Sequence, residues 1–196
     1  MNVSYSQVLE NTIFPSFIIS AKPSVSIKKI EKECYEIKSN FKNVRTSNSG
    51  SSFHSEVFGD KTDYENFSEL KKLEKVISNF TETELNKKNF KVKITDCSWW
   101  VNINHFNSYN TPHMHGRSDV IGVFYVKIPN NSGNLILMRN DGSDYTNLFK
   151  NKPELKRIGI PAEIGRLYIM PGHLWHYVET NESQEDRISI AYNIKF

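Results

Sequence analysis

The stretch RISIAYNI, residues 187–194, alternates small or polar side chains with large apolar ones. Successive side chains of a β-strand point to opposite faces, so this alternation predicts a strand with one buried face. Arg187 and Ser189 fall on one face together with Ala191 and Asn193, and the apolar side chains share the other face. The strand therefore directs an arginine and a serine to the same side of a β-structure.

An arginine directed into a small β-structure requires an anion, because leaving a buried charge unpaired costs several kcal/mol. A carboxylate held by the Arg187 guanidinium, with Ser189 adding a hydroxyl, is the natural occupant, at about 1.5–3 kcal/mol per charge-assisted bond. The alternative is a surface ion pair between Arg187 and a nearby acid, which would be Glu179, Glu185 or Asp186.

The segments before this strand carry the same kind of signal. Residues 90–94 alternate apolar and polar side chains, and β-branched or aromatic residues are concentrated in 98–104, 120–128, 134–139 and 166–169. Turn-forming sequences separate several of these segments, at 129–133, 140–142 and 171–172. The second half of the chain is therefore predicted to consist of short antiparallel strands.

The first half of the chain has a helical period instead. Apolar residues recur every three or four positions within 23–41, where Ser24 or Ser26 could cap the start, and again within 67–80. Helices followed by a run of strands predict a mainly β fold, a sandwich or barrel with N-terminal helices packed on one side. A chain of 196 residues is long enough for one domain with a sizeable core, and we expect a single domain.

Composition and charge exclude several classes of protein. With 38% hydrophobic residues the chain is neither disordered nor fibrous, and a net charge of +3 does not favour a nucleic-acid partner. Two cysteines, Cys34 and Cys97, form no disulfide framework and are expected in the core, which suits a reducing compartment. No secretory or membrane segment is recognisable, so we expect a soluble cytoplasmic protein.

Five of the six histidines lie in the strand-rich half of the chain. His113 and His115 are two residues apart, so on an extended strand both imidazoles project from one face and could bind one metal ion. His176 is the leading candidate for a third ligand, and three imidazoles leave positions open for a substrate. Alternatively, the first two are ordinary turn or surface residues, His173 and His176 form a surface pair, and His105 is structural or lines a pocket.

In order along the chain, these motifs resemble the iron(II)- and 2-oxoglutarate-dependent oxygenases, in particular a bacterial and phage branch with a prolyl-hydroxylase-like core. The matching elements are His113-x-His115, the segments 122–126 and 161–171, His176, and Arg187-x-Ser189 within 187–193. The segments 13–15 and 47–50 also match, so the resemblance spans nearly the whole chain. It implies a double-stranded β-helix (jelly roll, cupin-like) in residues 90–196, supported by a helical region in 1–89.

The resemblance also implies roles for individual residues. His113 and His176 match two iron ligands, and His115 stands where most of the superfamily has Asp or Glu. Arg187 and Ser189 match the pair that holds the distal carboxylate of 2-oxoglutarate. Tyr125 matches a supporting tyrosine, and Asn102 is a further candidate for contact with this co-substrate.

The histidine at position 115 departs from the usual pattern of the superfamily. An imidazole in place of a carboxylate leaves the iron site one positive charge richer, although neutral imidazole is a competent ligand. Asp119 is the only nearby carboxylate in the sequence and is the alternative third ligand.

The activity implied by the resemblance is hydroxylation of a substrate, coupled to decarboxylation of 2-oxoglutarate to succinate and CO2, with Fe(II) as cofactor and ascorbate as a stimulant. Two alternatives stay open: a cupin-like three-histidine enzyme without 2-oxoglutarate, and a non-catalytic metal-binding module.

The identity of the substrate, a small molecule or a protein side chain, is not encoded in a recognisable motif. The segments 46–61 and 139–152 are candidate selecting loops, and Trp99, Trp175 and Tyr109 are candidate pocket walls. The oligomeric state is not encoded in a recognisable motif either, but edge strands of such sandwiches often pair, which makes a homodimer one option. The compartment would be the host cytoplasm for a phage-encoded protein.

Overall fold

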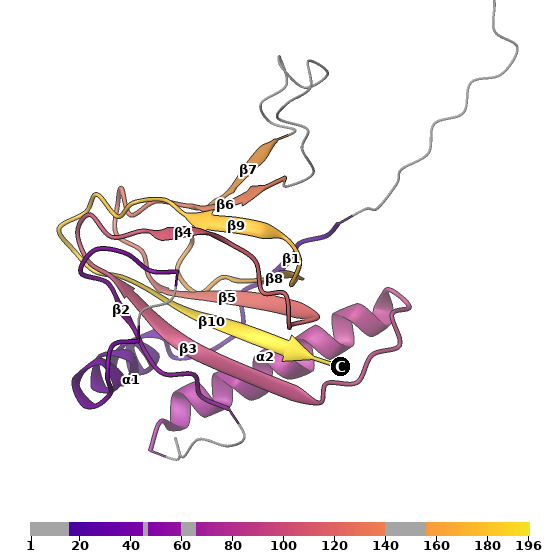
Figure 1. Ribbon diagram of the computed structural model, residues 1–196. Coiled ribbons are helices and arrows are strands. Elements are labelled where there is room, and N and C mark those ends of the chain that lie inside the picture. Colours follow the sequence, from indigo (N-terminus) through magenta and orange to yellow (C-terminus); the bar gives the residue numbers. More distant parts are fainter. Residues whose placement is uncertain (1–15, 45–46, 60–65, 140–155) are drawn as a thin grey trace, which may run out of the picture.

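The computed structural model describes residues 16–44, 47–59, 66–139 and 156–196. Two antiparallel sheets lie one above the other, and two helices pack on the outer side of the larger sheet (Figure 1). This arrangement confirms the predicted mainly β class with N-terminal helices. The predicted selecting loops at 46–61 and 139–152 and the turn at 140–142 fall wholly or partly outside the described residues.

The larger sheet has the strand order β1-β8-β5-β10-β3-β2, and the smaller sheet has the order β4-β9-β6-β7. The larger sheet is built from β1 (Ile19–Ala21), β8 (Leu167–Pro171), β5 (Val120–Lys127), β10 (Arg187–Lys195), β3 (Asp96–Asn104) and β2 (Phe53–His54). The smaller sheet is built from β4 (Asn110–His113), β9 (Trp175–Val178), β6 (Leu135–Met138) and β7 (Arg157–Ile160). All neighbouring strands are antiparallel.

The two helices cover the face of the larger sheet that points away from the smaller one (Figure 1). Helix α1 (Ile27–Asn40) begins after Ser26, whose side chain makes no capping hydrogen bond. Helix α2 (Ser68–Lys87) extends beyond its predicted end, because Leu85 continues its buried stripe. The apolar stripes of both helices and of β3, β5 and β10 form the main core, in which both free cysteines are buried.

Strand β10 shows the alternation expected from its sequence. Ile188, Ile190, Tyr192 and Ile194 are fully buried in the core beneath the helices. The other face of the strand lines a cavity between the two sheets, which Arg187 enters together with its neighbours on that face. The predicted division of the two faces is therefore confirmed.

Residues 90–94, predicted as a strand, are not one. Asn89 and Lys91 have φ values of 67° and 52°, in the left-handed region, which interrupts an extended conformation. The backbone N–H groups of Val92 and Ile94 donate to side chains of α2, Asn86 and Glu82, instead of to a neighbouring strand. The alternation reflects the packing of Val92 and Ile94 against the core and not a strand pairing.

Two short strands of the N-terminal half complete the larger sheet. Ile19 of β1 pairs with Ile169, and Phe53 of β2 pairs with Ile103. Residues 1–89, which were predicted to form a helical region that supports the β-domain, therefore also supply both edge strands of the larger sheet.

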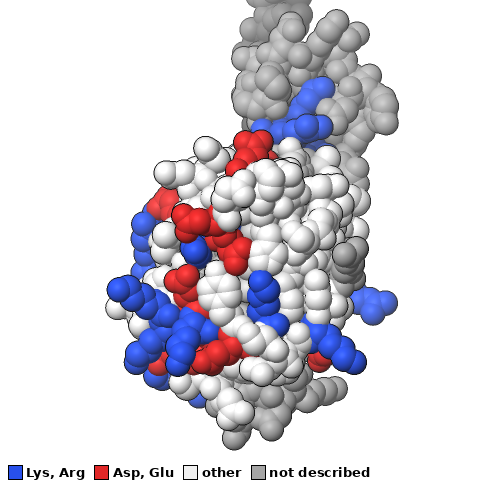
Figure 2. Space-filling view, turned by 90° about the vertical axis from the view of Figure 1, so that its left-hand side faces the viewer, with Lys and Arg blue, Asp and Glu red and all other residues white. Residues whose placement is uncertain are grey.

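None of the helices in the described segments is both long and apolar enough to span a membrane. On the face shown in Figure 2, Lys and Arg side chains lie beside Asp and Glu side chains instead of forming a region of one sign. Ion pairs such as Lys32–Glu36, at 3.5 Å, and Lys127–Glu185, at 3.2 Å, illustrate this mixing.

Candidate metal centre

Three histidines meet in the cavity between the sheets. His113 of β4 is paired in register with His176 of β9, which places both side chains on the same face of the smaller sheet. One nitrogen of each of these rings and one of His115 lie within 4.8 Å of one another. The predicted set of three metal ligands is therefore brought together by the fold.

His115 reaches the cluster by a different route from the one predicted. Strand β4 ends at His113, so His115 does not lie on the same strand face. Its backbone N–H donates to the carbonyl of Gly172 at 2.9 Å, which holds the segment after β4 against the turn after β8. Its side chain is oriented by Asn193 on β10, so the larger sheet positions this third ligand.

Hydrogen bonds fix the orientation and tautomer of all three rings. The Nδ1 atoms of His113 and His176 donate to the carbonyls of Thr111 and Leu174, at 2.7 and 2.8 Å. The Nδ1 of His115 donates to Oδ1 of Asn193 at 2.6 Å. Because these acceptors are oxygens, each Nδ1 carries the proton and each Nε2 is left with a free lone pair.

The three rings are neutral in the folded protein. Burial lowers the pKa of His113 and His115, and burial together with the nearby His113 lowers the pKa of His176 to about 3. Neutral imidazoles with converging lone pairs suit a divalent transition metal such as Fe(II), and three such donors leave coordination positions open.

Asp119, the alternative third ligand, lies outside this cluster. Its Oδ2 accepts a hydrogen bond from the backbone N–H of Phe196 at 2.9 Å, so the carboxylate ties down the end of the described chain. His173 is exposed and does not belong to the cluster either.

The same cavity extends to Arg187. The Arg187 side chain is only 1% exposed, and its Nε has no hydrogen-bond partner among the described residues. Its guanidinium lies 5.4 Å from the ring centre of Tyr125, whose hydroxyl is also buried and makes no hydrogen bond to any described residue. Ser189 pairs in register with both Asn102 and Tyr125, so these four polar side chains line one end of the cavity.

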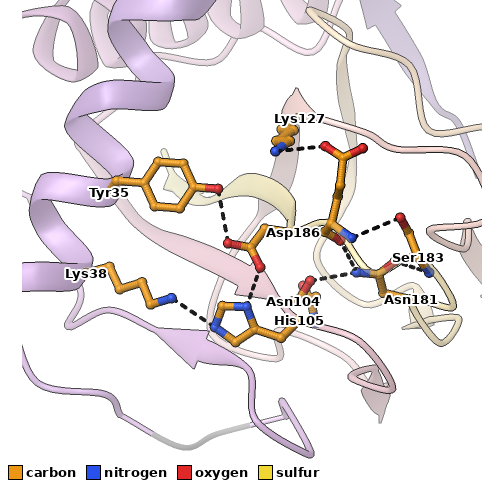
Figure 3. A network of polar contacts seen from close by, with 9 residues as sticks. Tyr35, Lys38, Asn104, His105, Lys127, Asn181, Ser183 and Asp186 are labelled. Carbon is orange, nitrogen blue, oxygen red and sulfur yellow. Dashed lines mark hydrogen bonds and ion pairs between the residues drawn. The ribbon is translucent and has the colours of Figure 1, made fainter.

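The acids that could have neutralised Arg187 are all engaged elsewhere. Asp186 accepts from the Tyr35 hydroxyl at 3.0 Å and from the His105 ring, as Figure 3 shows. Glu185 pairs with Lys127, and Glu179 accepts from the backbone N–H of Asn134. The surface ion pair considered for Arg187 is therefore wrong, and among the described residues its charge has no acidic partner.

His105, for which the sequence offered no partner, belongs to a polar network beside the start of β10 (Figure 3). Its Nε2 lies 3.0 Å from Nζ of Lys38 on α1, and its Nδ1 contacts Asp186. Because Lys38 can only donate, Nε2 of His105 accepts and Nδ1 donates to Asp186. The network joins α1 and the end of β3 to the residue that precedes Arg187.

The aromatic residues beside the site differ from those predicted. Trp99 is fully buried in the core, stacked on Phe58, and Tyr109 and Trp175 do not line the cavity. The wall is instead formed by Trp100, which stacks between the rings of His115 and His54. His54 was missed because it lies outside the strand-rich half and belongs to no recognisable spacing.

Comparison with known proteins agrees with this arrangement. Residues 98–193 match a family model described as "Putative 2OG-Fe(II) oxygenase", and this segment contains the three clustered histidines and the side chains around Arg187. None of the curated protein sequences matches the chain.

Several solved structures share the fold, which is the double-stranded β-helix expected from the sequence. A prolyl-4-hydroxylase from Pseudomonas putida is 12% identical with a TM-score of 0.64, covering 91% of each chain. A Trichoplax adhaerens prolyl hydroxylase, solved with a hypoxia-inducible-factor peptide, is 16% identical with a TM-score of 0.66, covering 91% of this chain and 82% of its own. A collagen prolyl hydroxylase from Paramecium Bursaria Chlorella virus-1, in complex with 2-oxoglutarate, is 14% identical with a TM-score of 0.58. The match covers 90% of this chain and 94% of the viral one.

Proposed function

Because this chain belongs to the iron(II)- and 2-oxoglutarate-dependent oxygenases, we propose that it is a hydroxylase that converts 2-oxoglutarate to succinate and CO2 while it oxidises its substrate. One observation carries the proposal. A single cavity holds three neutral histidines with converging nitrogens and a fully buried arginine without an acidic partner among the described residues. The first group fits a metal cation and the second fits the carboxylate of an organic acid.

The histidines would hold Fe(II) through their Nε2 atoms. When bound, Fe(II) supplies the activation of dioxygen and the oxidative decarboxylation of 2-oxoglutarate. The chain contributes rigid ligand geometry, since Thr111, Leu174 and Asn193 each fix one ring through its Nδ1.

The side chains at the other end of the cavity would hold the distal carboxylate of 2-oxoglutarate. Arg187 supplies charge and donors, and the hydroxyls of Ser189 and Tyr125 can each donate one hydrogen bond. The Oδ1 of Asn102 is buried without a partner in the part of the chain that the structure describes, but only its amide nitrogen can donate to a carboxylate. Asn102 would therefore turn its Nδ2 toward the co-substrate.

A three-histidine site changes the electrostatics of co-substrate binding. With neutral ligands the site keeps the full double charge of Fe(II), whereas a carboxylate ligand would reduce it by one. Since the distal carboxylate of 2-oxoglutarate would pair with Arg187, its other carboxylate would bring one negative charge to this doubly positive site. We therefore expect iron and 2-oxoglutarate to increase each other's affinity.

The proposal is tested by measuring succinate formed from 2-oxoglutarate in the presence of Fe(II) and ascorbate, without a substrate. We expect slow turnover that is lost in His176→Ala and requires much more 2-oxoglutarate in Arg187→Ala. His173→Ala and Arg157→Ala are matched controls, because both residues are exposed and lie outside the cavity. Ascorbate is expected to raise the yield by keeping the iron reduced.

Anaerobic titration supplies a readout that does not depend on turnover. Addition of 2-oxoglutarate to the Fe(II)-loaded protein should produce a visible charge-transfer band, which Arg187→Ala shifts to higher concentrations. Iron binding without any effect of 2-oxoglutarate would contradict the proposal and favour a three-histidine enzyme of the cupin kind.

The buried free cysteines, Cys34 and Cys97, are compatible with a reducing compartment. We therefore place the activity in the cytoplasm, or in the host cytoplasm if a phage encodes the protein.

A further inference from the structure

A second and larger cavity opens beside the histidine cluster. Its volume is about 570 Å³, within the range of small-molecule sites, and it shares His113 and His115 with the cavity described above. Neither Arg187 nor Ser189 lines it. We call it the substrate cleft, because a ligand in it would lie next to the metal centre without occupying the place assigned to 2-oxoglutarate.

One wall of the substrate cleft is aromatic and held in place. The ring of Trp100 stacks between His54 and His115, with ring centres 5.5 and 5.6 Å apart and interplanar angles of 18° and 26°. His54 is anchored through its Nδ1 to the carbonyl of Ser55 at 2.7 Å. Beside this wall, Val57 is 51% exposed, so the cleft offers a planar and apolar surface to a ligand.

Among the residues that the structure describes, one charged side chain lines the substrate cleft. These lining residues include no aspartate, glutamate or lysine, and burial lowers the pKa of His54. Arg117 is exposed at the rim, two residues after His115, and forms no ion pair with any other residue that the structure describes. A guanidinium that faces a cleft without acidic groups attracts an anion.

We propose that the substrate cleft binds a substrate with a planar or apolar body against Trp100 and an anionic group, such as a carboxylate, on Arg117. This inference rests on the proposed function, since it takes the histidine cluster as the place of the reaction. The inference specifies the chemical class of the substrate, and it makes Arg117 a determinant of substrate specificity.

The test compares two probes of nearly equal size and shape, one charged and one neutral: 4-fluorophenylacetate and its amide. The protein is loaded with Mn(II) and saturating 2-oxoglutarate under argon, which prevents turnover and occupies Arg187. Broadening of the fluorine signal by Mn(II) then reports binding close to the metal. We expect the acid to bind about tenfold more tightly than the amide, the difference that one charge-assisted hydrogen bond provides.

Arg117→Gln should abolish this preference and leave the affinity of the amide unchanged, and Arg117→Lys should retain part of it. Arg157→Gln is the matched control, because it removes the same charge from an exposed position outside the cleft. A preference for the acid that survives in Arg117→Gln would overturn the inference.

A second probe pair distinguishes a free acid from an acidic side chain. It consists of the blocked peptide acetyl-(4-fluoro-Phe)-Asp-Gly-amide and its Asn counterpart, which are read by the same fluorine signal. A preference for the charged member that depends on Arg117 in either pair supports the anion site and identifies its source. Its absence from both pairs overturns the inference.

The affinity of 2-oxoglutarate for the Mn(II) protein is measured separately. It is expected to be the same in Arg117→Gln, because this residue lies outside the cavity of Arg187. Wild-type protein that does not bind 2-oxoglutarate would contradict the proposed function, and the dependence of the probes on Arg117 would still decide the anion site.

Discussion

Asn193 orients His115, the candidate metal ligand that lies beyond the end of β4. Its Oδ1 accepts from Nδ1 of His115 at 2.6 Å, which fixes both the ring and its tautomer. Loss of such a partner typically weakens metal binding about 10–100-fold, and we expect this range for Asn193→Ala. Competition with a chelator measures the change.

Two variants on the same strand sharpen this test. Asn193→Asp keeps an acceptor oxygen and should restore most of the affinity for the metal. Lys195→Ala, on an exposed position of β10, should leave the affinity unchanged. An unchanged affinity in Asn193→Ala would show that the segment after β4 holds His115 without this bond.

The histidines also make the stability of the metal-free protein depend on pH. Burial lowers the pKa of His176 from 6.5 to about 3, so below pH 6.5 the unfolded chain binds a proton that the folded chain does not. The free energy of unfolding should therefore fall as the pH is lowered from 6.5 toward 3, and this contribution is complete above 6.5. Urea unfolding of wild type and His176→Gln at several pH values isolates the effect, and a difference that does not vary with pH would refute it.

Single residues also show where reading the sequence succeeds and where it fails. The placement of Arg187 and Ser189 on the face of β10 that lines the cavity could be predicted, because alternation alone puts them on one face. The two adjacent tryptophans could not be separated in this way, because Trp99 and Trp100 point to opposite faces of β3 and only the fold decides which face meets the site. Asn193 was placed on the correct face, but its bond to His115 spans 78 positions and leaves no local signal.

At the level of elements, the turn after β8 must pass very close to the segment that carries His115. A Cβ atom at Gly172 would lie 2.0 Å from the carbonyl oxygen of Ser118 and 3.0 Å from that of His115. The Gly172 backbone also accepts from the N–H of His115 and donates to Asp119. Gly172→Ala must therefore push the two segments apart, and we expect weaker metal binding together with a lower melting temperature.

The turn contact can be distinguished from a general loss of stability. Gly159→Ala in β7 meets only the end of the Ile136 side chain, at 3.6 Å, and serves as a control. If Gly172→Ala lowers the melting temperature without any change in metal affinity, the turn supports the fold and does not position His115.

The polar network between α1, β3 and β10 should control the affinity for 2-oxoglutarate. Asp186 precedes Arg187 and is held by Tyr35 on α1 and by His105, which follows directly after β3 (Figure 3). Asp186→Asn weakens both contacts, so we expect a several-fold higher dissociation constant for 2-oxoglutarate and an unchanged affinity for the metal.

The neighbouring residue provides a control for this prediction. Glu185→Gln removes one charge from the same segment, but Glu185 is 67% exposed, and its one ion pair among the described residues is with Lys127 at the surface. An equal effect of both variants would mean that the charge of the segment, and not the network, controls binding.

Elements differ in how well periodicity predicts them. Helices α1 and α2 were predictable because their buried stripes repeat over 14 and 20 residues. The strands β1 and β2, with three and two residues, are too short for alternation to be recognised and exist only through their partners. Residues 90–94 alternate without forming a strand, because their N–H groups find acceptors on α2.

Across the whole molecule, the candidate site is shared between the two sheets. The smaller sheet supplies His113 and His176, whereas the larger sheet supplies Arg187, Ser189 and the residue that orients His115. A metal ion and a dicarboxylate bound between the sheets would therefore bridge them. Ligands that bind only the folded state raise its stability, so both should raise the melting temperature.

The buried charge of Arg187 lowers the stability of the protein when no ligand is bound. Its guanidinium is buried without an acidic partner among the described residues, and the Tyr125 ring at 5.4 Å compensates only part of the lost hydration. Replacing it with methionine, which fills a similar volume without a charge, should raise the free energy of unfolding in the absence of ligands by about 1–4 kcal/mol. The same variant should lose the stabilisation that 2-oxoglutarate gives to the wild type. Urea unfolding with and without 2-oxoglutarate measures both effects, with Arg157→Met as the exposed control. An Arg187→Met protein less stable than the wild type would mean that the charge is already compensated in the free protein, and the cavity would then have no need of an anion.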